Sequence, residues 1–243
     1  MINISLVSYL NSYPYHYGLI NETNSFYNKL DIVNPAQCAK NFQEGISNVA
    51  LVPVGALHGL KNYKIIKPFC ISANGEVRSV FLFSQKPVED TKTIVFDSDS
   101  RSSNLLIQVL CKYYWKINPN FTKNNNSLQA EARIGIGDKA FKLKKKYAYS
   151  YDLSIFWKEM TNLPFVFAVW ITKSEIAEEE LSLLKIALEN GINNIHGAVV
   201  HFGSAGLTEE DAIKYLSKNI NFKMNTASEK GMQRFLELSK NFI

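Results

Sequence analysis

The sequence predicts a two-lobed α/β protein with a ligand cleft between the lobes. In the first third of the chain, apolar runs of strand length alternate with helix-start signals, a pattern typical of βαβ units around a parallel sheet. Two strongly apolar stretches, near residues 80–90 and 165–172, are candidate crossings between the lobes. We therefore expect lobe I to comprise residues 1–86 and 172–243, with residues 87–171 inserted as lobe II. A cleft between two such lobes is a natural place for a small ligand.

The composition favours a small anionic ligand over a nucleic-acid partner. The chain has 243 residues, is 46% hydrophobic and carries a net charge of +5, so it can bury one large core or two smaller ones. Its Lys and Arg residues are scattered, and no basic stripe is interleaved with aromatic residues. The clearest basic run, residues 142–146, is typical of the solvated end of a helix. We expect no nucleic-acid partner.

The cysteines and the hydropathy predict a cytoplasmic protein without a membrane partner. Cys38, Cys70 and Cys111 are odd in number and widely spaced, which argues against a disulfide framework or a zinc site and suits a reducing compartment. No apolar run approaches the ~20 residues needed to span a bilayer. The opening apolar run is too short for a secretion signal and lacks a basic start.

The opening of the chain combines a buried strand with a polar turn. Ile2–Val7 has the β-branched and Leu content of a first buried strand. Residues 8–11 would then follow its carboxyl end, where open α/β sheets bind ligands. Pro14 fits the first turn of the next helix, because proline has no N–H to lose there. Taken alone, the stretch is more simply a strand–helix junction with surface polar residues and a packed tyrosine cluster.

The remaining elements of lobe I follow from apolar runs and proline positions. We expect a strand over residues 30–33, a helix opened by Pro35 over 35–45 and a second strand over 49–52. A short helical turn over 53–57 follows, and residues 75–84 form a polar turn that leads into a strongly apolar strand.

Lobe II and the C-terminal part are predicted in the same way. Residues 93–96 form a strand, 102–114 a helix with one apolar face, 118–127 an exposed Asn-rich loop, 132–136 a strand, 153–161 a helix and 163–170 a buried strand. The chain after Lys173 is helical in character, with a long amphipathic helix over 175–192, an N-terminal cap at Thr208 and a last helix over 228–242.

No motif indicates a metal or a cofactor. The Gly135-Ile136-Gly137 stretch lacks the third glycine of a dinucleotide fingerprint and is best interpreted as a turn. The chain contains no Walker loop, HExxH or GxSxG motif. Its four histidines are dispersed, and we expect them to lie in the core or on the surface: His16, His58, His196 and His201.

The loop of residues 97–104 could receive a carboxylate. It combines serine hydroxyls, Arg101 and the free amides of a helix start. Arginine is scarce, since only four of the 27 basic residues are Arg, and an Arg fork can hold a planar carboxylate bidentately, unlike Lys. Ordinary helix capping beside a solvated Arg explains this loop equally well.

Taken together, six stretches resemble the chorismate dehydratases of the futalosine route to menaquinone. They occur in the family's order and spacing and cover most of residues 1–172. The most specific pieces are three short stretches: Ser8-Tyr9-Leu10-Asn11, Arg78-Ser79-Val80 and Ser100–Ser103. The C-terminal helices match the family only in their helical character. The matching stretches are Val7–Leu19, Ala50–Pro53, Val77–Ser84, Asp97–Ser103, Ile136–Ala140 and Leu163–Trp170.

The resemblance implies the fold of type 2 periplasmic solute-binding proteins, with a central ligand cleft. It implies a hydro-lyase without cofactor or metal that eliminates water from the dianion chorismate to give 3-[(1-carboxyvinyl)oxy]benzoate. A 1,4-dihydroxy-6-naphthoate synthase of the same route is the second candidate, because that family's opening differs from the one seen here. A small-anion binding protein without catalysis and an effector-sensing domain of a regulator are further alternatives.

The resemblance also implies roles for individual residues. Asn11 and Ser79 would lie at the reacting centre as catalytic residues. Asp138 is expected to cap a helix, because a carboxylate beside a dianion would repel it. No matching stretch supplies a clear base, so the enolpyruvyl carboxylate of the substrate itself is our candidate. The expected substrate-binding residues are Ser8, Tyr9, Arg78, Ser100, Arg101, Ser102 and Ser103.

Overall fold

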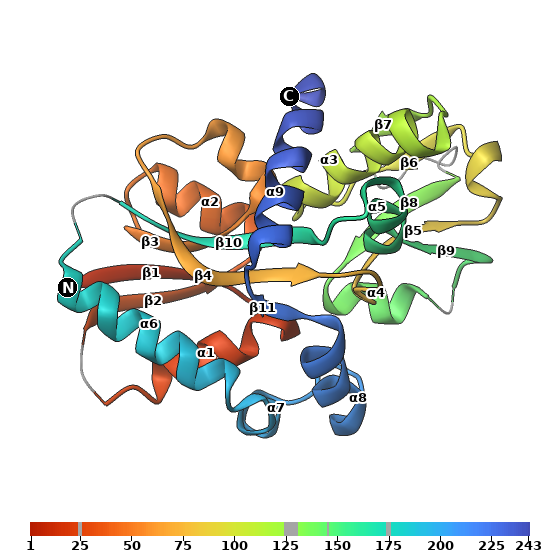
Figure 1. Ribbon diagram of the computed structural model, residues 1–243. Helices are drawn as coiled ribbons and strands as arrows, with labels where there is room; N and C mark the ends of the chain where they lie inside the picture. Colours follow the sequence, from red (N-terminus) through yellow and green to blue (C-terminus); the bar gives the residue numbers. More distant parts are fainter. Residues whose placement is uncertain (24–25, 124–130, 145, 174–175) are drawn as a thin grey trace.

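The computed structural model describes residues 1–23, 26–123, 131–144, 146–173 and 176–243, which form two sheets (Figure 1). The six-stranded sheet has the order β11-β4-β10-β3-β1-β2, and the five-stranded sheet the order β7-β6-β8-β5-β9. The first contains β1 (Ile2–Val7), β2 (Tyr27–Val33), β3 (Val49–Pro53), β4 (Lys64–Ala73), β10 (Phe165–Thr172) and β11 (Asn221–Lys223). The second contains β5 (Val80–Ser84), β6 (Thr93–Val95), β7 (Asn120–Thr122), β8 (Ala132–Ile136) and β9 (Tyr149–Asp152).

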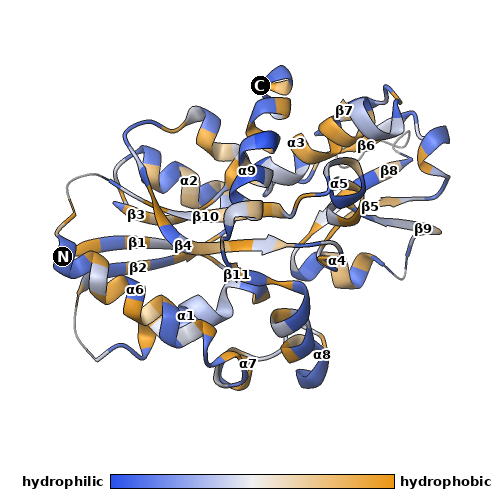
Figure 2. Ribbon diagram, viewed as in Figure 1, coloured by the Kyte–Doolittle hydropathy of each residue, from blue (hydrophilic) through white to orange (hydrophobic). Residues whose placement is uncertain are grey.

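The first strand is buried inside the six-stranded sheet, between β3 and the edge strand β2, and its composition predicts this burial. β1 pairs in parallel with β2 and β3, and β10 pairs antiparallel with β3 and β4. Every residue of β3 and β10 is buried, since strands covered on both faces carry continuous apolar runs. Figure 2 shows orange, hydrophobic segments along β1, β3 and β5, whereas the outer helix α8 is largely blue.

Helices cover both faces of the six-stranded sheet. In Figure 1, α1 and α6 lie below it and α2 lies above it, while α9 crosses the middle of the molecule and packs against β10 and α3. The helices are α1 (Tyr13–Ile20), α2 (Pro35–Gln43), α3 (Arg101–Leu110), α4 (Asp138–Leu143), α5 (Leu153–Thr161), α6 (Glu178–Ile192), α7 (Ile195–Phe202), α8 (Glu209–Lys214) and α9 (Thr226–Ser239). Short helical turns are η1 (Leu10–Ser12), η2 (Val54–Gly59), η3 (Val88–Asp90), η4 (Cys111–Trp115), η5 (Tyr215–Asn219) and η6 (Lys240–Phe242).

Proline positions and caps account for the helix starts. Pro14 and Pro35 lie in the first turns of α1 and α2, and the side chain of Thr208 accepts from the Asp211 N–H at the start of α8. The predictions for these three sites are confirmed. None of the helices in the described ranges is long and apolar enough to cross a membrane.

The chain changes sheets at other residues than expected. β5, expected in lobe I, pairs with β8 and β9 in the five-stranded sheet, while β10, expected in lobe II, lies in the six-stranded sheet. The crossings therefore fall at residues 74–79 and 162–164 and not at 86 and 171. A buried apolar strand fits the middle of either sheet, so its hydrophobicity does not tell which strands will flank it.

Four short or interrupted strands were not predicted, among them β9 (Tyr149–Asp152). β4 contains Lys64, Lys67 and Pro68, which break its apolar pattern. β11 and β7 have three residues each, and β7 forms the edge of its sheet inside the segment expected as a loop. The loop assignment for 118–127 is therefore wrong at residues 120–122, and residues 124–127 lie outside the described part of the chain.

Candidate active site between the two sheets

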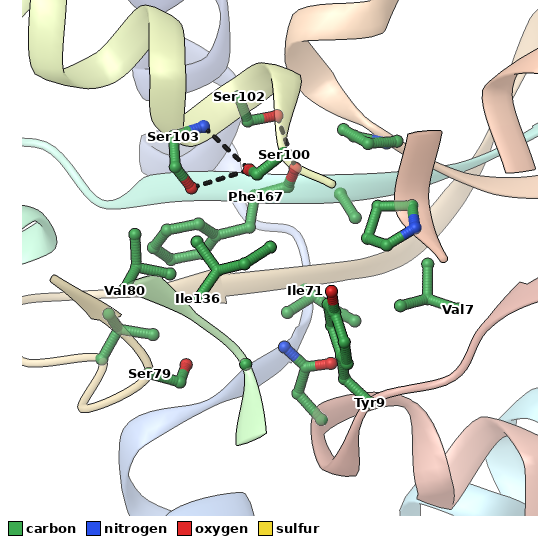
Figure 3. Close-up of a pocket in the computed structure, with 16 residues that line it drawn as sticks. Val7, Tyr9, Ile71, Ser79, Val80, Ser100, Ser102, Ser103, Ile136 and Phe167 are labelled. Atoms are coloured by element: carbon green, nitrogen blue, oxygen red, sulfur yellow. Dashed lines mark hydrogen bonds between the residues drawn. The ribbon is translucent and has the colours of Figure 1, made fainter. Parts of the chain in front are cut away.

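A cavity lies between the carboxyl end of β1 and the amino end of α3 (Figure 3). Its volume is about 60 Å³, less than the several hundred Å³ typical of small-molecule sites, so its walls lie close together in this structure. Its apolar walls come from both sheets: Val7, Pro35, Pro53, Ile71, Val77, Val80, Ile136, Phe167 and Ala168. The other lining residues are Tyr9, Asn11, Ser79, Ser100, Ser102, Ser103 and Gly137.

None of these sixteen described lining residues is a Lys or an Arg. An anion in this cavity would be held by neutral donors, namely hydroxyls, an amide and main-chain N–H groups. Figure 3 shows Ser100, Ser102 and Ser103, at the amino end of α3, on one side of the cavity and Ser79 and Tyr9 on the opposite side. The polar groups are therefore divided between two opposite walls of the cavity. This arrangement suits a ligand that has a polar group at each end.

Tyr9 closes one side of the cavity by contacting the other sheet. A Cβ atom at Gly137 would lie 2.9 Å from the Tyr9 ring, and Gly137 has a φ of +56° that favours glycine. The Tyr9 hydroxyl is buried without a hydrogen-bond partner in the described structure. Burial raises the pKa of Tyr9 well above its usual value, and the carboxylates of Asp99, Asp97 and Asp138 raise it further. Tyr9 therefore stays protonated and can donate to a ligand.

Asn11 is positioned by the turn η1 directly after β1. The Ser12 hydroxyl donates to the main-chain oxygen of Tyr9 at 2.8 Å, which closes this turn. The Asn11 Oδ1 atom is buried and has no hydrogen-bond partner among the described residues. Since an unsatisfied buried acceptor is costly, this oxygen is well suited to accept from a ligand hydroxyl.

Ser79 is positioned by a turn that a buried carboxylate holds. Asp152 accepts from the main-chain N–H groups of Val77 at 3.0 Å and Arg78 at 2.7 Å. Arg78 has a φ of 63°, a conformation that a non-glycine residue adopts only under external constraint. Ser79, only 1% exposed, then points its side chain at the cavity and accepts a hydrogen bond from the Tyr215 hydroxyl at 2.8 Å.

The serines at the start of α3 do not offer equal hydrogen-bonding capacity. The Ser100 hydroxyl accepts from the Ser103 N–H at 3.1 Å and donates to the Ser103 hydroxyl at 2.9 Å. The Ser102 hydroxyl accepts from the Gly55 N–H at 3.0 Å and donates to the Phe167 main-chain oxygen at 3.1 Å, so it joins α3 to η2 and β10. Within the described ranges, the Ser103 hydroxyl hydrogen has no acceptor, and Ser103 is thus the best-placed donor of the three.

Three of the expected substrate-binding residues do not line the cavity. The side chains of Ser8 and Arg101 are exposed, and that of Arg78 is half-buried outside the lining. Their roles stay predictions. Asp138 does not cap its own helix α4: its Oδ1 accepts from the main-chain N–H of Leu10 at 3.2 Å, and it thereby caps η1.

Two residues of the site were missed by the sequence prediction, Asp152 and Tyr215. Asp152 directly precedes a correctly predicted helix and could have been recognised as its N-cap, because its Oδ1 accepts from the Ser154 N–H. Tyr215 lies at the start of η5, near no motif, and no local signal could have found it. No cluster of three or more metal-binding side chains occurs within the described ranges.

Solved structures with the same fold are solute-binding proteins and a protein of similar length from an archaeon. The protein AF1704 from Archaeoglobus fulgidus is 14% identical, with a TM-score of 0.78 over 99% of this chain and 97% of its own. The alkanesulfonate-binding protein SsuA from Xanthomonas axonopodis pv. citri, bound to MOPS, is 12% identical, with a TM-score of 0.65 over 99% and 92%.

A third similar structure is the Candida albicans CA3427 gene product, described as having the generic periplasmic binding protein fold. It is 11% identical, with a TM-score of 0.69 over 100% of this chain and 90% of its own. The expected periplasmic-binding-protein-like fold is confirmed. A family model described as menaquinone biosynthesis matches residues 2–241, so the protein belongs to the menaquinone biosynthesis family.

Proposed function

We propose that the protein is a chorismate dehydratase, a hydro-lyase that converts chorismate to 3-[(1-carboxyvinyl)oxy]benzoate. The observation that carries this proposal is the meeting of Asn11 and Ser79 in one cavity, with the start of α3 on the opposite wall. The resemblance assigned these residues to the reacting centre and to carboxylate binding. Membership in the menaquinone biosynthesis family agrees with a reaction on the route to menaquinone.

The reaction removes the C3 proton and the C4 hydroxyl of chorismate, and the ring becomes aromatic. A base takes the C3 proton, the C3–H electron pair forms the new ring double bond, and the C4–O bond breaks. The departing hydroxyl takes up one proton and leaves as water, so that the net loss from chorismate is the C3 hydrogen and the C4 hydroxyl. Ser79 can donate a hydrogen bond to the departing oxygen, and Asn11 Oδ1 can accept from that hydroxyl and orient it. Such preorganised groups accelerate a reaction where they meet charge that develops in the transition state.

The substrate carboxylates would be held by neutral donors. The Ser103 hydroxyl and the amino end of α3 suit one of them, because helix starts bind anions. The absence of Lys and Arg from the described lining residues leaves a carboxylate there without a cationic partner. Burial without such a partner raises the pKa of a carboxyl group. The enolpyruvyl carboxylate therefore becomes a stronger base towards the nearby C3 proton.

Incubation of the purified protein with fresh chorismate tests the proposal. The expected result is stoichiometric formation of the aromatic product, detected by ultraviolet absorbance and NMR, that continues after treatment with a chelator. Binding of chorismate without conversion would favour a small-anion binding protein. Conversion of a cyclised futalosine to the dihydroxynaphthoate, with chorismate untouched, would identify the second candidate reaction.

A further inference from the structure

The C-terminal part of the chain contributes a buried tyrosine to the candidate reacting centre. Tyr215 is 2% exposed and begins the π-helical turn η5 after α8, a type of distortion often found at functional sites. Its ring packs edge-on against Phe141, with centroids 5.6 Å apart. Its hydroxyl donates to the Ser79 Oγ atom at 2.8 Å, across 136 residues of sequence.

This hydrogen bond determines where Ser79 can donate its own hydrogen. A serine hydroxyl has one hydrogen to donate and two lone pairs that accept. Since Ser79 Oγ accepts from Tyr215, its hydrogen must point elsewhere, and within the described part of the chain no group accepts it. Ser79 lines the cavity, so a ligand there is the available acceptor (Figure 3).

Tyr215 is well suited to this task because it remains protonated. Burial raises its pKa well above the usual value, and the hydrogen bonds with Ser79 and Asn11 offset only part of that shift. The Asn11 Oδ1 atom, which belongs to the lining of the same cavity, has no hydrogen-bond partner among the described residues. The geometry therefore links Tyr215 directly to Ser79.

We propose that Tyr215 is a positioning residue that orients Ser79. By donating to Ser79 Oγ, it directs the serine hydrogen into the cavity. The chemical consequence rests on the proposed function: in chorismate, the departing C4 oxygen would receive the hydrogen bond from Ser79. The orientation itself can be tested without catalysis.

The kinetic test compares Tyr215→Phe with Tyr15→Phe. Both variants keep a buried ring and lose one hydroxyl, and Tyr15 donates to the main-chain oxygens of Cys70 and Phe222 outside the cavity lining. For Tyr215→Phe we expect kcat with chorismate to fall at least about tenfold while KM changes less than about threefold, as for loss of an interaction made in the transition state. Tyr15→Phe should keep the wild-type kcat. In a Ser79→Ala background, Tyr215→Phe should lower kcat by less than about twofold, because the two residues act as a unit.

The structural test is a crystal structure of Tyr215→Phe beside the wild type. The Ser79 side chain should occupy one rotamer in the wild type and more than one in the variant. A single unchanged Ser79 rotamer in the variant, or an unchanged kcat, would overturn the positioning role. If the wild type does not convert chorismate, the proposed function fails, and the Ser79 rotamer then decides the positioning role by itself.

Discussion

The carboxylate of Asp138 accepts a hydrogen bond from the main-chain N–H of Leu10 at 3.2 Å, although the two residues are 128 positions apart. Leu10 begins η1 after a strand of the six-stranded sheet, and Asp138 begins α4 after a strand of the five-stranded sheet. Together with the contact between Tyr9 and Gly137, this bond joins the two sheets at one edge of the cavity. It therefore positions Tyr9 and Asn11, which flank Leu10.

Replacing Asp138 should destabilise this edge of the cavity. Asp138→Ala leaves the fully buried Leu10 without an acceptor for its N–H, which should lower the free energy of unfolding by about 1–3 kcal/mol. Asp138→Asn retains an oxygen that can accept from the Leu10 N–H, so its free energy of unfolding should fall much less. Urea unfolding at pH 7 measures both. KM for chorismate should rise in Asp138→Ala, because Tyr9 and Asn11 are then less well positioned.

Lys139→Ala is the matched control for this experiment. Lys139 pairs with Asp99 at 2.7 Å, but its side chain is 59% exposed, and exposed ion pairs contribute at most about 1 kcal/mol. Its stability should stay near that of the wild type. If the free energy of unfolding fell equally in Lys139→Ala and Asp138→Ala, the hydrogen bond between Asp138 and Leu10 would not be what stabilises this edge of the cavity.

Asp152 should make the stability of the protein depend on pH. Burial raises its native pKa from 3.8 to about 6, against the opposing hydrogen bonds from Arg78, Ser154 and Val77. Between these values the unfolded chain has lost the proton that the native protein still holds. The contribution of this group to the free energy of unfolding therefore falls as the pH rises from about 4 to 6, by roughly 3 kcal/mol, and is constant above that window.

The variant Asp152→Asn isolates this contribution. Asn does not titrate, so the stability of the variant relative to the wild type should increase as the pH rises through the same window. Urea unfolding of both proteins at several pH values from 4 to 7 measures the difference, in which the other titrating groups cancel. Parallel curves for the two proteins would contradict the raised pKa of Asp152.

The sequence predicted the elements better than their pairing. Pro35 and the apolar run of β3 identified their elements to within a few residues, because proline and continuous hydrophobicity act locally. The sheet to which β5 belongs depends on the partners on each side, which no local pattern specifies. β4 was missed because Lys64, Lys67 and Pro68 interrupt it.

Residues of the candidate site could be predicted from the sequence only where they lie in a recognisable motif. Asn11 and Ser79 occur in stretches that resemble a known family, and both line the cavity. Tyr215 reaches Ser79 only because the chain returns after 136 residues, and nothing around it signals that contact. The exposure of Arg101 depends on the rotation of α3, which its apolar positions define only approximately.

The crossing of α1 and α6 should not tolerate a side chain at Gly18. A Cβ atom there would lie 1.9 Å from the main-chain oxygen of Ala187, and one at Gly191 would lie 1.9 Å from that of Pro14. Gly18→Ala must therefore push the helices apart, and we expect a loss of about 1–3 kcal/mol or more in the free energy of unfolding.

Gly59→Ala provides the matched comparison, because a Cβ atom there would have no neighbour within 4 Å. Its stability should equal or slightly exceed that of the wild type, since alanine restricts the unfolded chain. Thermal and urea unfolding of both variants are the measurements. A stable Gly18→Ala protein would show that the helices can separate at little cost.

The last prediction concerns the base that removes the C3 proton. No histidine occurs among the sixteen described lining residues of the cavity. His16 stacks on Phe202 at 4.3 Å, and burial and His201 lower its pKa. His58 is hydrogen-bonded to Ser239 at 2.9 Å, and His196 lies 3.7 Å from Glu209. All four histidines are thus engaged elsewhere or lie outside the cavity, which leaves the enolpyruvyl carboxylate of the substrate as the candidate base.

Substitution of each histidine by alanine separates the two kinds of base. If the substrate supplies the base, His16→Ala, His58→Ala, His196→Ala and His201→Ala should each keep kcat within about tenfold of the wild type, well short of the 10²–10⁴ that a general base contributes. In the same assay, the kcat of Asn11→Ala and of Ser79→Ala should fall by a factor of about 10²–10³, as expected when a hydrogen bond made in the transition state is lost. Circular dichroism of each variant verifies its folding. A thousandfold loss in a folded histidine variant would make that residue the base and reject assistance by the substrate.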